Sequence, residues 1–462
     1  MRYISTRGLA QPQSFESMLL SGLAPDGGLF LPEVWPQFGK PEIARLATGR
    51  YVDAAFAILP SFVGDAFARD EIRADIESAY AAFDSAEVAS LVRLRENLFL
   101  LELFHGPTLA FKDIALQVQG RLLARALERR GSFSTIVAAT SGDTGSAAIA
   151  ALGDLPRVNL FVLHPKGHVS EIQRRQMTTT ACNNVYNIAL EGTFDDAQNI
   201  VKSLFSDREF VARVHLAAAN SINFFRIAAQ CVYYFTAAAR FGSPPVFVVP
   251  TGNFGDVFAG EAAMRMGLGI ERLVIATNAN DILCRALEDG LYAAGPPRHT
   301  LSPSMDIQVA SNFERAYFEA SGRDPASTRA TMSDFETRRR FHLPADVLAN
   351  LRARYLALRC SDEETLETMD LIYRETGRFI DPHTAVGVAV ALARGNSRER
   401  PMIVLSTAHP AKFPDAVYRA TGIVPPLPRR VADLYEKAER ASTLPADVST
   451  VRTFIEQRLA NS

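Results

Sequence analysis

The sequence predicts an α/β protein in which parallel sheets are covered by helices on both faces and follow a mostly helical N-terminal region. Three observations support this fold class. Short β-branched runs alternate with helical stretches from about residue 98 onward. The runs are apolar throughout, which is typical of strands buried on both faces. With 462 residues and 48% hydrophobic content, the chain can also fill sizeable cores.

The expected elements follow in order. The first 95 residues contain two stretches with helical character, "EIARLATGRYVDAAFAIL" and "DEIRADIESAYAAF". Six buried strands are then expected at residues 134–139, 158–165, 185–190, 246–252, 273–278 and 401–406. Helical text such as "SAAIAAL", "FDDAQNIVKSLF" and "DVFAGEAAMRMG" follows several of them. We expect residues 320–359 to be irregular and then helical, and the proline-marked end after residue 421 to continue into an exposed helix.

The composition favours a small-molecule ligand. A net charge of -2 with 22% charged residues gives no basic field for nucleic acid and no acidic excess typical of disorder. The four cysteines lie far apart without zinc-site spacing, so we expect no metal and reduced, structural thiols in a cytosolic protein. The N-terminus lacks the apolar core of a secretory signal.

The longest apolar run, residues 222–241, approaches the length of a membrane span but carries polar residues. Asn223, Arg226 and Gln230 fall at positions i, i+3 and i+7, which form one stripe on a helix. We interpret the run as a buried helix. Its polar stripe lines a site, or it faces solvent or another polar helix; periodicity alone does not decide between these alternatives.

Two strand exits are rich in glycine and hydroxyl groups. The segment "TSGDTG" at residues 140–145 separates a strand from a helix, where free backbone N–H groups can hold a carboxylate or phosphate. Its simpler interpretation is an ordinary N-cap. At the second exit, Gly252 and Gly255 bracket Asn253 and Phe254, which suits an anion or an ordinary tight turn. Neither segment is a phosphate loop of the NTPases or a dinucleotide fingerprint.

A third strand exit, "STAHPAKF" at residues 406–413, combines hydroxyls with a histidine and a lysine. A hydroxyl at such a strand end can meet a ring nitrogen or a phosphate. For His409 a capping or core role is favoured over catalysis.

The scarcity of lysine singles out Lys112 in "HGPTLAFKDIALQ". Only six of the 49 basic residues are lysines, and this one lies among apolar neighbours. A buried lysine can lose its proton and act as an amine nucleophile, whereas arginine stays charged. An aldehyde cofactor with an anionic tail and a ring, such as pyridoxal phosphate, would match an amine, a glycine turn and a hydroxyl. A snorkelling side chain or an ion pair with Asp113 are the simpler alternatives.

Taken together, these stretches resemble the threonine synthases, pyridoxal-phosphate enzymes with a tryptophan-synthase-β-like fold. The segments that carry the resemblance stand in the family's order: "ELFHGPTLAFKD" (102–113), "TSGDTGSAA" (140–148), "NSIN" (220–223), "PTGNFGD" (250–256) and "STAHPAKF" (406–413). The segment "DGGLFLPE" (26–33) extends it over nearly the whole chain.

The resemblance implies a fold type II enzyme with two doubly wound, sheet-containing lobes. It implies an N-terminal domain at residues 1–95, a catalytic core of two interleaved α/β lobes at 96–420 and a C-terminal extension at 421–462.

The resemblance also implies roles for single residues. Lys112 would bind the aldehyde of the cofactor covalently and move protons, with Phe111 beside the cofactor ring. Thr407 would hydrogen-bond the pyridine nitrogen as a neutral hydroxyl, so that Lys112 has more of the proton chemistry to do. The cofactor phosphate would lie in the turn formed by Gly252, Asn253, Phe254, Gly255 and Asp256.

The remaining implied residues concern the substrate. Its carboxylate would bind the loop of Ser141, Gly142, Asp143 and Thr144, where related dehydratases and cysteine synthases usually have Ser-Gly-Asn-Thr-Gly. The aspartate form resembles the threonine synthase branch. Four further residues would lie near the cofactor or substrate: Asn220, Ser221, Asn223 and Arg226.

The reaction implied is the conversion of O-phospho-L-homoserine and water into L-threonine and phosphate, a lyase reaction of threonine biosynthesis. Lys166, Arg226 and Lys412 are candidates for binding the substrate phosphate. The alternatives are a phospho-lyase or dehydratase that stops at a keto acid, and a non-catalytic homologue. We expect a cytoplasmic monomer or homodimer that binds neither nucleic acid nor membrane.

Overall fold

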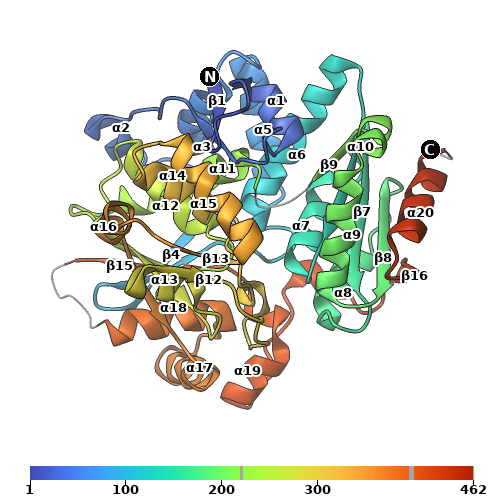
Figure 1. Cartoon of the computed structure of the whole chain (residues 1–462). Coiled ribbons are helices and arrows are strands. Elements are labelled where there is room, and N and C mark those ends of the chain that lie inside the picture. Colours follow the sequence, from blue (N-terminus) through green and yellow to red (C-terminus); the bar gives the residue numbers. More distant parts are fainter. Residues whose placement is uncertain (219–221, 395–399, 461–462) are drawn as a thin grey trace. The chain divides into compact units, whose positions relative to one another are not determined.

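The computed structural model describes residues 1–218, 222–394 and 400–460 (Figure 1). The chain forms two compact units, each assembled from two stretches of sequence. Unit 1 consists of Met1–Gly106 and Ser221–Pro425, and unit 2 of Pro107–Asn220 and Pro426–Ser462. These two units do not correspond to the expected division at residues 95 and 420. That division therefore remains a prediction.

Unit 1 is built on a six-stranded sheet. In spatial order its strands are β14 (Tyr355–Arg359), β11 (Arg272–Thr277), β10 (Val246–Pro250), β15 (Met402–Ser406), β5 (Leu98–Glu102) and β4 (Ser90–Arg95). All neighbours are parallel except β4, which pairs antiparallel with β5 at the edge. Three of the six predicted strands are thereby confirmed, as β10, β11 and β15.

Helices cover both faces of this sheet. One face packs on α17, α18 and α19 through a core that includes Val248, Val274 and Val404. The opposite face meets α11 and α12, where Tyr234 lies against Phe247. The helices of unit 1 are α1 (Phe15–Ser21), α2 (Lys40–Arg45), α3 (Tyr51–Ile58), α4 (Pro60–Val63), α5 (Arg69–Tyr80), α11 (Phe224–Ala238), α12 (Gly255–Arg265), α13 (Ile282–Asp289), α14 (Phe313–Ala320), α15 (Pro325–Arg338), α16 (Ala345–Arg354), α17 (Asp362–Thr376), α18 (Pro382–Ala393) and α19 (Pro414–Thr421).

The main regular elements of the first 95 residues are the helices α1 to α5, although less than half of these residues are helical. A small antiparallel sheet accompanies the helices. Its strands, in spatial order, are β2 (Gln13–Ser14), β1 (Arg2–Ser5) and β3 (Phe30–Pro32). A second small sheet pairs β12 (Leu291–Ala293) with β13 (Arg340–His342).

Unit 2 is built on a fully parallel five-stranded sheet. In spatial order its strands are β16 (Ser442–Pro445), β8 (Val185–Glu191), β7 (Val158–Pro165), β6 (Ser134–Ala139) and β9 (Leu216–Ala218). The other three predicted strands are thereby confirmed, as β6, β7 and β8. Both units match the doubly wound α/β class expected from the sequence.

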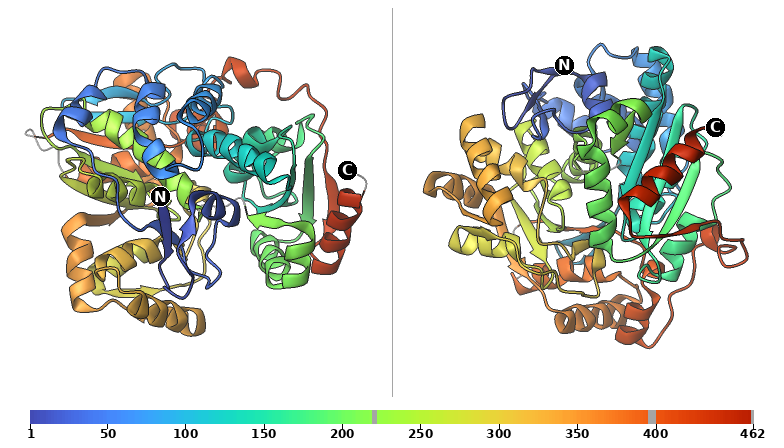
Figure 2. Two further views of the ribbon diagram at one scale, coloured as in Figure 1. Left: turned by 90° about the horizontal axis from the view of Figure 1, so that it is seen from above. Right: turned by 45° about the vertical axis from the view of Figure 1, so that its right-hand side comes forward.

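Helices also cover both faces of the unit 2 sheet. One face packs on α9, α10 and α20, and Figure 2 shows the red C-terminal helix lying along it. The other face meets α7 and α8; the Asn187 amide, for example, donates to the Met177 carbonyl of α8 at 2.8 Å. The helices of unit 2 are α6 (Lys112–Arg130), α7 (Asp143–Leu152), α8 (Glu171–Thr178), α9 (Phe194–Ser206), α10 (Arg208–Val214) and α20 (Val448–Ala460).

Two expectations from the sequence were wrong. The end of the segment 320–359 is not helical, because Tyr355–Arg359 leaves α16 and pairs with β11 as a strand. The terminal helix is not simply exposed: Val451 and Ile455 of α20 are fully buried against the unit 2 sheet. The apolar positions that define β14 and the buried face of α20 are few, and charged residues surround them in the sequence.

The apolar run at 222–241 forms α11, and every residue of this helix is buried. Its polar stripe does not face solvent, because Asn223, Arg226 and Gln230 are between 2% and 4% exposed. Asn223 caps the helix: its side-chain oxygen accepts from the Phe225 amide at 3.1 Å, while its amide donates to the Leu19 carbonyl at 2.8 Å. Over the described residues, no helix combines the length and apolar character that crossing a membrane requires.

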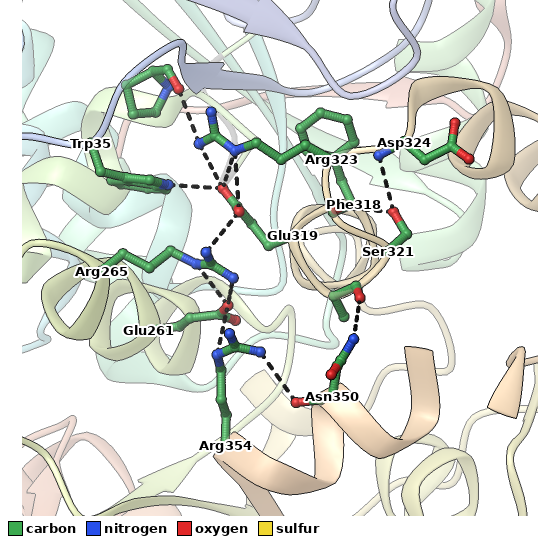
Figure 3. Close-up of polar contacts among 12 residues, drawn as sticks. Trp35, Glu261, Arg265, Phe318, Glu319, Ser321, Arg323, Asp324, Asn350 and Arg354 are labelled. Atoms are coloured by element: carbon green, nitrogen blue, oxygen red, sulfur yellow. Dashed lines mark hydrogen bonds and ion pairs between the residues drawn. The ribbon is translucent and has the colours of Figure 1, made fainter. Parts of the chain in front are cut away.

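A buried ion cluster fixes α12, the helix that follows the turn at Gly252. Figure 3 shows two acids, Glu261 and Glu319, held between arginines. Arg265 of α12 pairs with both, at 2.7 and 2.9 Å. Arg323 adds a 2.8 Å contact to Glu319, and the Trp35 indole donates to the same carboxylate at 2.8 Å. The cluster therefore ties the N-terminal region to the helices behind the turn.

Candidate active site

Lys112 is the first residue of α6 and its amine is buried. The residue is 9% exposed, so the snorkelling interpretation is wrong. Its Nζ lies 3.3 Å from Asp143 Oδ2 and 5.1 Å from the centre of the Phe111 ring. The turn before it is fixed by Asp113, whose carboxylate accepts from the Thr108 amide at 2.8 Å and hydroxyl at 2.7 Å. A buried lysine amine, unlike an arginine, can hold a proton or release it.

The segment 140–145 folds into a closed turn at the start of α7. Thr140 Oγ1 accepts from the amides of Gly142 and Gly145, both at 2.9 Å. Gly142 has φ 140°, and a Cβ on it would lie 2.6 Å from the Gln173 side chain. Two of the N–H groups expected to be open for an anion are therefore occupied by Thr140. Ser141 and Thr144 remain half-buried at the surface of the turn.

In the same unit, the Asp143 carboxylate has a second partner. Its Oδ1 accepts from Gln173 Nε2 at 2.8 Å, while Oδ2 faces Lys112. Asp143 is 5% exposed and Gln173 is 3% exposed. The sequence-based interpretation missed Gln173, because its spacing from the "TSGDTG" segment carries no signal.

In unit 1, the turn at 252–255 has the shape of an anion cradle. Phe254 has φ 65°, and its ring packs against Phe313 and Tyr355 at 5.4 and 5.3 Å between centroids. Phe254 is the N-cap of α12 and Gly255 is its first residue, so the backbone of the turn forms the helix N-terminus. A Cβ on Gly252 would lie 2.7 Å from the Ser304 carbonyl oxygen, so no larger residue fits. Glycine amides at a helix N-terminus match the donor set that a phosphate group needs.

Two side chains that the sequence did not point to support this turn. The Asn253 carbonyl accepts from the backbone and side-chain amides of Asn312, both at 3.1 Å. Asn312 in turn bonds the fully buried guanidinium of Arg315, which also donates to the Phe30 carbonyl at 3.0 Å. Asp256, predicted to bind the cofactor, accepts from the hydroxyls of Tyr233 and Tyr234.

Thr407 lies beside the same edge of the unit 1 sheet. It follows β15, which pairs in parallel with β10, so the segments after both strands leave the sheet together. Thr407 is 6% exposed. The preceding residue, Ser406, shares a hydroxyl contact of 3.0 Å with Thr384 in the first turn of α18, a helix that Asp381 caps. The position fits a hydroxyl presented to a buried ring nitrogen.

His383 links these segments and was also missed from the sequence. Its Nδ1 is 2.8 Å from Asp381 Oδ1, and its Nε2 accepts from the Ser304 amide at 3.2 Å. The ring therefore carries its proton on Nδ1 and stiffens the chain that touches Gly252. His409, by contrast, accepts from the Ala411 amide at 3.1 Å, which confirms the capping interpretation.

The three candidate cations for a substrate phosphate differ in burial. Lys166 is on the surface, with a side chain that is 54% exposed and 3.4 Å from Glu191. Lys412 is fully buried and Arg226 is 4% exposed. Arg226 Nη1 has no hydrogen-bond partner among the described residues, and burial lowers the pKa of this guanidinium to about 10. A buried guanidinium whose Nη1 has no partner among the described residues is a site where an anion would be stabilised.

Two predicted substrate residues, Asn220 and Ser221, lie outside the described residues. All four cysteines are free thiols; three are buried and Cys182 is partly exposed.

Comparison with known proteins gives a consistent result along the chain. Residues 86–345 match the family model of pyridoxal-phosphate-dependent enzymes, and residues 2–80 and 384–455 match the N-terminal and C-terminal models of threonine synthase. Threonine synthase of Pseudomonas aeruginosa is 46% identical over 99% of this chain and 98% of its own length.

The chain belongs to the threonine synthase family. A crystal structure of pyridoxal-phosphate-bound threonine synthase from Brucella melitensis has a TM-score of 0.96 and 46% identity, covering 99% of both chains. That of the yeast enzyme has a TM-score of 0.94 and 38% identity, covering 100% of this chain and 99% of its own. A pyridoxal-phosphate-dependent aspartate racemase, 13% identical with a TM-score of 0.51, shares the fold alone.

The family membership confirms the fold type II class, the pyridoxal phosphate cofactor and an enzyme of the lyase class. It does not favour the alternatives of a phospho-lyase, a dehydratase or a non-catalytic homologue. The roles of single residues remain predictions, and the local geometry of each unit provides their support.

Proposed function

We propose that this protein converts O-phospho-L-homoserine and water into L-threonine and inorganic phosphate. The observation that carries the proposal is the buried Lys112 amine 3.3 Å from the Asp143 carboxylate, in a chain of the threonine synthase family. An arginine at this position could not act as an amine nucleophile, and a lysine on the surface would not have indicated a catalytic role.

The residues would divide the work between binding and proton transfer. Lys112 would hold the cofactor through its ε-amine, with Phe111 beside the ring. The backbone of Gly252, Asn253, Phe254 and Gly255 would bind the cofactor phosphate, with Asp256 fixing the start of α12. Thr407 would accept or donate one hydrogen bond at the ring nitrogen. Bound in this way, pyridoxal phosphate supplies the electron withdrawal that acidifies the hydrogens of an attached amino acid.

Lys112 would then remove the α-proton of the substrate and return a proton at the end. In the overall reaction the Cγ–O bond to phosphate breaks, Cβ loses a proton, Cγ gains one, and water adds its hydroxyl at Cβ while its other proton goes to the released phosphate. Ser141, Gly142 and Thr144 would hold the substrate carboxylate, and Asn220, Ser221 and Asn223 would lie near it. Arg226 or Lys412 would bind the phosphate that leaves.

We also propose a cytoplasmic enzyme, active as a monomer or homodimer, that binds neither nucleic acid nor membrane. Within it, residues 1–95, 96–420 and 421–462 would be the N-terminal domain, the catalytic core and the C-terminal extension. Composition and cysteine usage support the statements on compartment and nucleic acid. The N-terminal family match at residues 2–80 supports the first boundary, whereas the C-terminal match begins at residue 384, before the proposed boundary at 421.

Product analysis tests the function. Purified protein is incubated with phosphohomoserine while phosphate release, threonine and 2-oxobutanoate are measured together. Equal amounts of threonine and phosphate are expected; 2-oxobutanoate as the sole organic product would overturn the proposal in favour of a phospho-lyase. In parallel, borohydride reduction of the holoenzyme followed by peptide mapping should find the cofactor on residue 112, and Lys112→Ala should remove the adduct.

A further inference from the structure

Asp143 and Gln173 form a buried pair that the proposed roles do not account for. A carboxylate at position 143 would repel a substrate carboxylate, so the aspartate does not suit the substrate role that the resemblance implies for its loop. Both of its oxygens have partners inside unit 2: Gln173 Nε2 at 2.8 Å and Lys112 Nζ at 3.3 Å. The carboxylate points at the lysine.

The orientation of the Gln173 amide is fixed from behind. Ser170 Oγ donates to Gln173 Oε1 at 2.9 Å, so the amide nitrogen is the end that faces Asp143. Ser170 is the N-cap of α8, and its hydroxyl also accepts from the Gln173 amide of the backbone. An ionised carboxylate only accepts hydrogen bonds, and the geometry supplies a donor on each side of it.

Glycine at position 142 allows this contact. The side chain of Gln173 lies where a Cβ on Gly142 would be, at 2.6 Å. The φ of 140° at Gly142 is also a conformation that other residues rarely adopt. Because position 142 has no side chain, the Gln173 side chain of α8 can contact Asp143 at the start of α7.

We propose that Gln173 is a positioning residue that holds the Asp143 carboxylate against the Lys112 amine, and that Asp143 retains the proton-carrying lysine rather than binding the substrate. The proposal rests on the proposed role of Lys112. The Lys112–Asp143 contact is longer than the 2.7–2.9 Å typical of a strong charged hydrogen bond. A contact of this length orients the amine without locking it, which suits a group that must join and leave a cofactor.

The test uses the holoenzymes of Gln173→Leu, Asp143→Asn and the double variant. Asn187→Leu is the matched control, because Asn187 also donates a buried amide hydrogen bond to α8, at its far end. The first readout is the pH midpoint of the visible absorbance of the bound cofactor, measured without substrate. Of the acids near Lys112 within unit 2, Asp143 faces its amine at 3.3 Å, and Asp113 accepts from Thr108, a contact that none of these substitutions removes.

Removal of the negative charge in Asp143→Asn should lower this midpoint, since a carboxylate favours the protonated form of the nitrogen it faces. Gln173→Leu should shift it in the same direction by a smaller amount, about half a pH unit. It should also lower kcat about tenfold to hundredfold with KM changed less than about threefold. Asn187→Leu should change neither.

The double variant decides between positioning and general support. If Gln173 acts through Asp143, adding Gln173→Leu to Asp143→Asn should change kcat by less than about twofold. Effects of the two substitutions that multiply would overturn the proposal, as would an unshifted absorbance midpoint in Gln173→Leu. If that variant does not fold, Gln173→Met replaces it, since methionine keeps the length and removes the donor. A shifted midpoint in a protein that makes no threonine would leave this inference standing and reject the proposed function.

Discussion

Two buried charge clusters in this protein use different cations. In unit 1, Glu261 and Glu319 are held by arginines at 2.7 to 2.9 Å, and both acids are almost fully buried. In unit 2, Lys112 faces the Asp143 carboxylate at 3.3 Å. Burial lowers the pKa of Arg265 and its two facing carboxylates outweigh that effect, so the pKa is raised and the charge is permanent.

The difference teaches what each cation is for. Arginine offers several donors in a fixed fork and stays charged, which suits a cluster that only joins segments. Lysine has one compact amine that can change its protonation state, which suits chemistry. In a chain with six lysines among 49 basic residues, a buried lysine is therefore informative.

Lys112→Arg should have the largest effect, because it tests directly whether lysine and arginine have different roles in the two clusters. The substitution keeps a cation beside Asp143 but removes the amine that can bind an aldehyde. We expect threonine formation to fall by about 10⁴-fold or more, because covalent binding and proton transfer are lost together. Steady-state kinetics and borohydride trapping check this. Retention of even about a tenth of the activity would show that the cation alone is needed at this position.

A substitution in the arginine cluster should lower the free energy of unfolding rather than the activity. Glu319→Gln leaves Arg323 and the Trp35 indole facing a neutral amide, and Arg265 with one acid. Breaking a buried pair from one side costs about 3–5 kcal/mol, so the free energy of unfolding should fall by that order. Chemical denaturation measures it. The control is Asp334→Asn, which removes an exposed pair with Arg338 and should cost less than about 0.5 kcal/mol.

If Glu319→Gln instead lowered kcat in fully folded protein, with little loss of stability, the cluster would take part in catalysis and the distinction between the two cations would fail.

A third prediction concerns pH and His409, the capping residue near Thr407. Burial, with a smaller contribution from His105, lowers the pKa of His409 from 6.5 to about 4. The unfolded chain therefore binds a proton that the folded chain does not, between these two values. Stability from the neutral ring is complete above about pH 6.5 and is lost as the pH falls toward 4.

The measurement compares wild type with His409→Asn, since asparagine can still accept from the Ala411 amide. Between pH 7 and 4.5, wild type should lose about 2–3 kcal/mol more than the variant in chemical denaturation. Equal losses in the two proteins would mean that His409 titrates in the folded state as it does in water.

The sequence predicted elements whose signal is local. The strands β6, β7 and β8 lie within a residue of their predicted ends, because each is a short apolar run between turn residues. Lys112, the glycine turn at 252 and the cap at His409 were also found from local patterns. The strand β14 was missed because only its pairing with β11 defines it.

The parts of the site that were missed depend on contacts between distant segments. Gln173 reaches Asp143 from thirty residues away, and Arg315 contacts Phe30 across 285 residues. No spacing in the sequence predicts such pairs. The burial of Arg226 and the exposure of Lys166 likewise follow from packing. The sequence alone did not decide between the candidate phosphate ligands, although it already favoured a surface role for Lys166.

The smallest expected effect tests whether Arg226 or Lys166 binds the substrate phosphate. Arg226→Met should raise KM for phosphohomoserine about tenfold, because its guanidinium is buried and its Nη1 has no partner in the described part of the chain, which makes it the better anion ligand. Inhibition by inorganic phosphate should weaken to the same degree, while thermal stability is kept or increased, since methionine removes a buried charge. Lys166→Met should change KM less than about twofold, because its amine is exposed and pairs with Glu191. The opposite pattern would assign the phosphate to the surface lysine, and Arg226 would then be a buried cation for which the fold alone gives no reason.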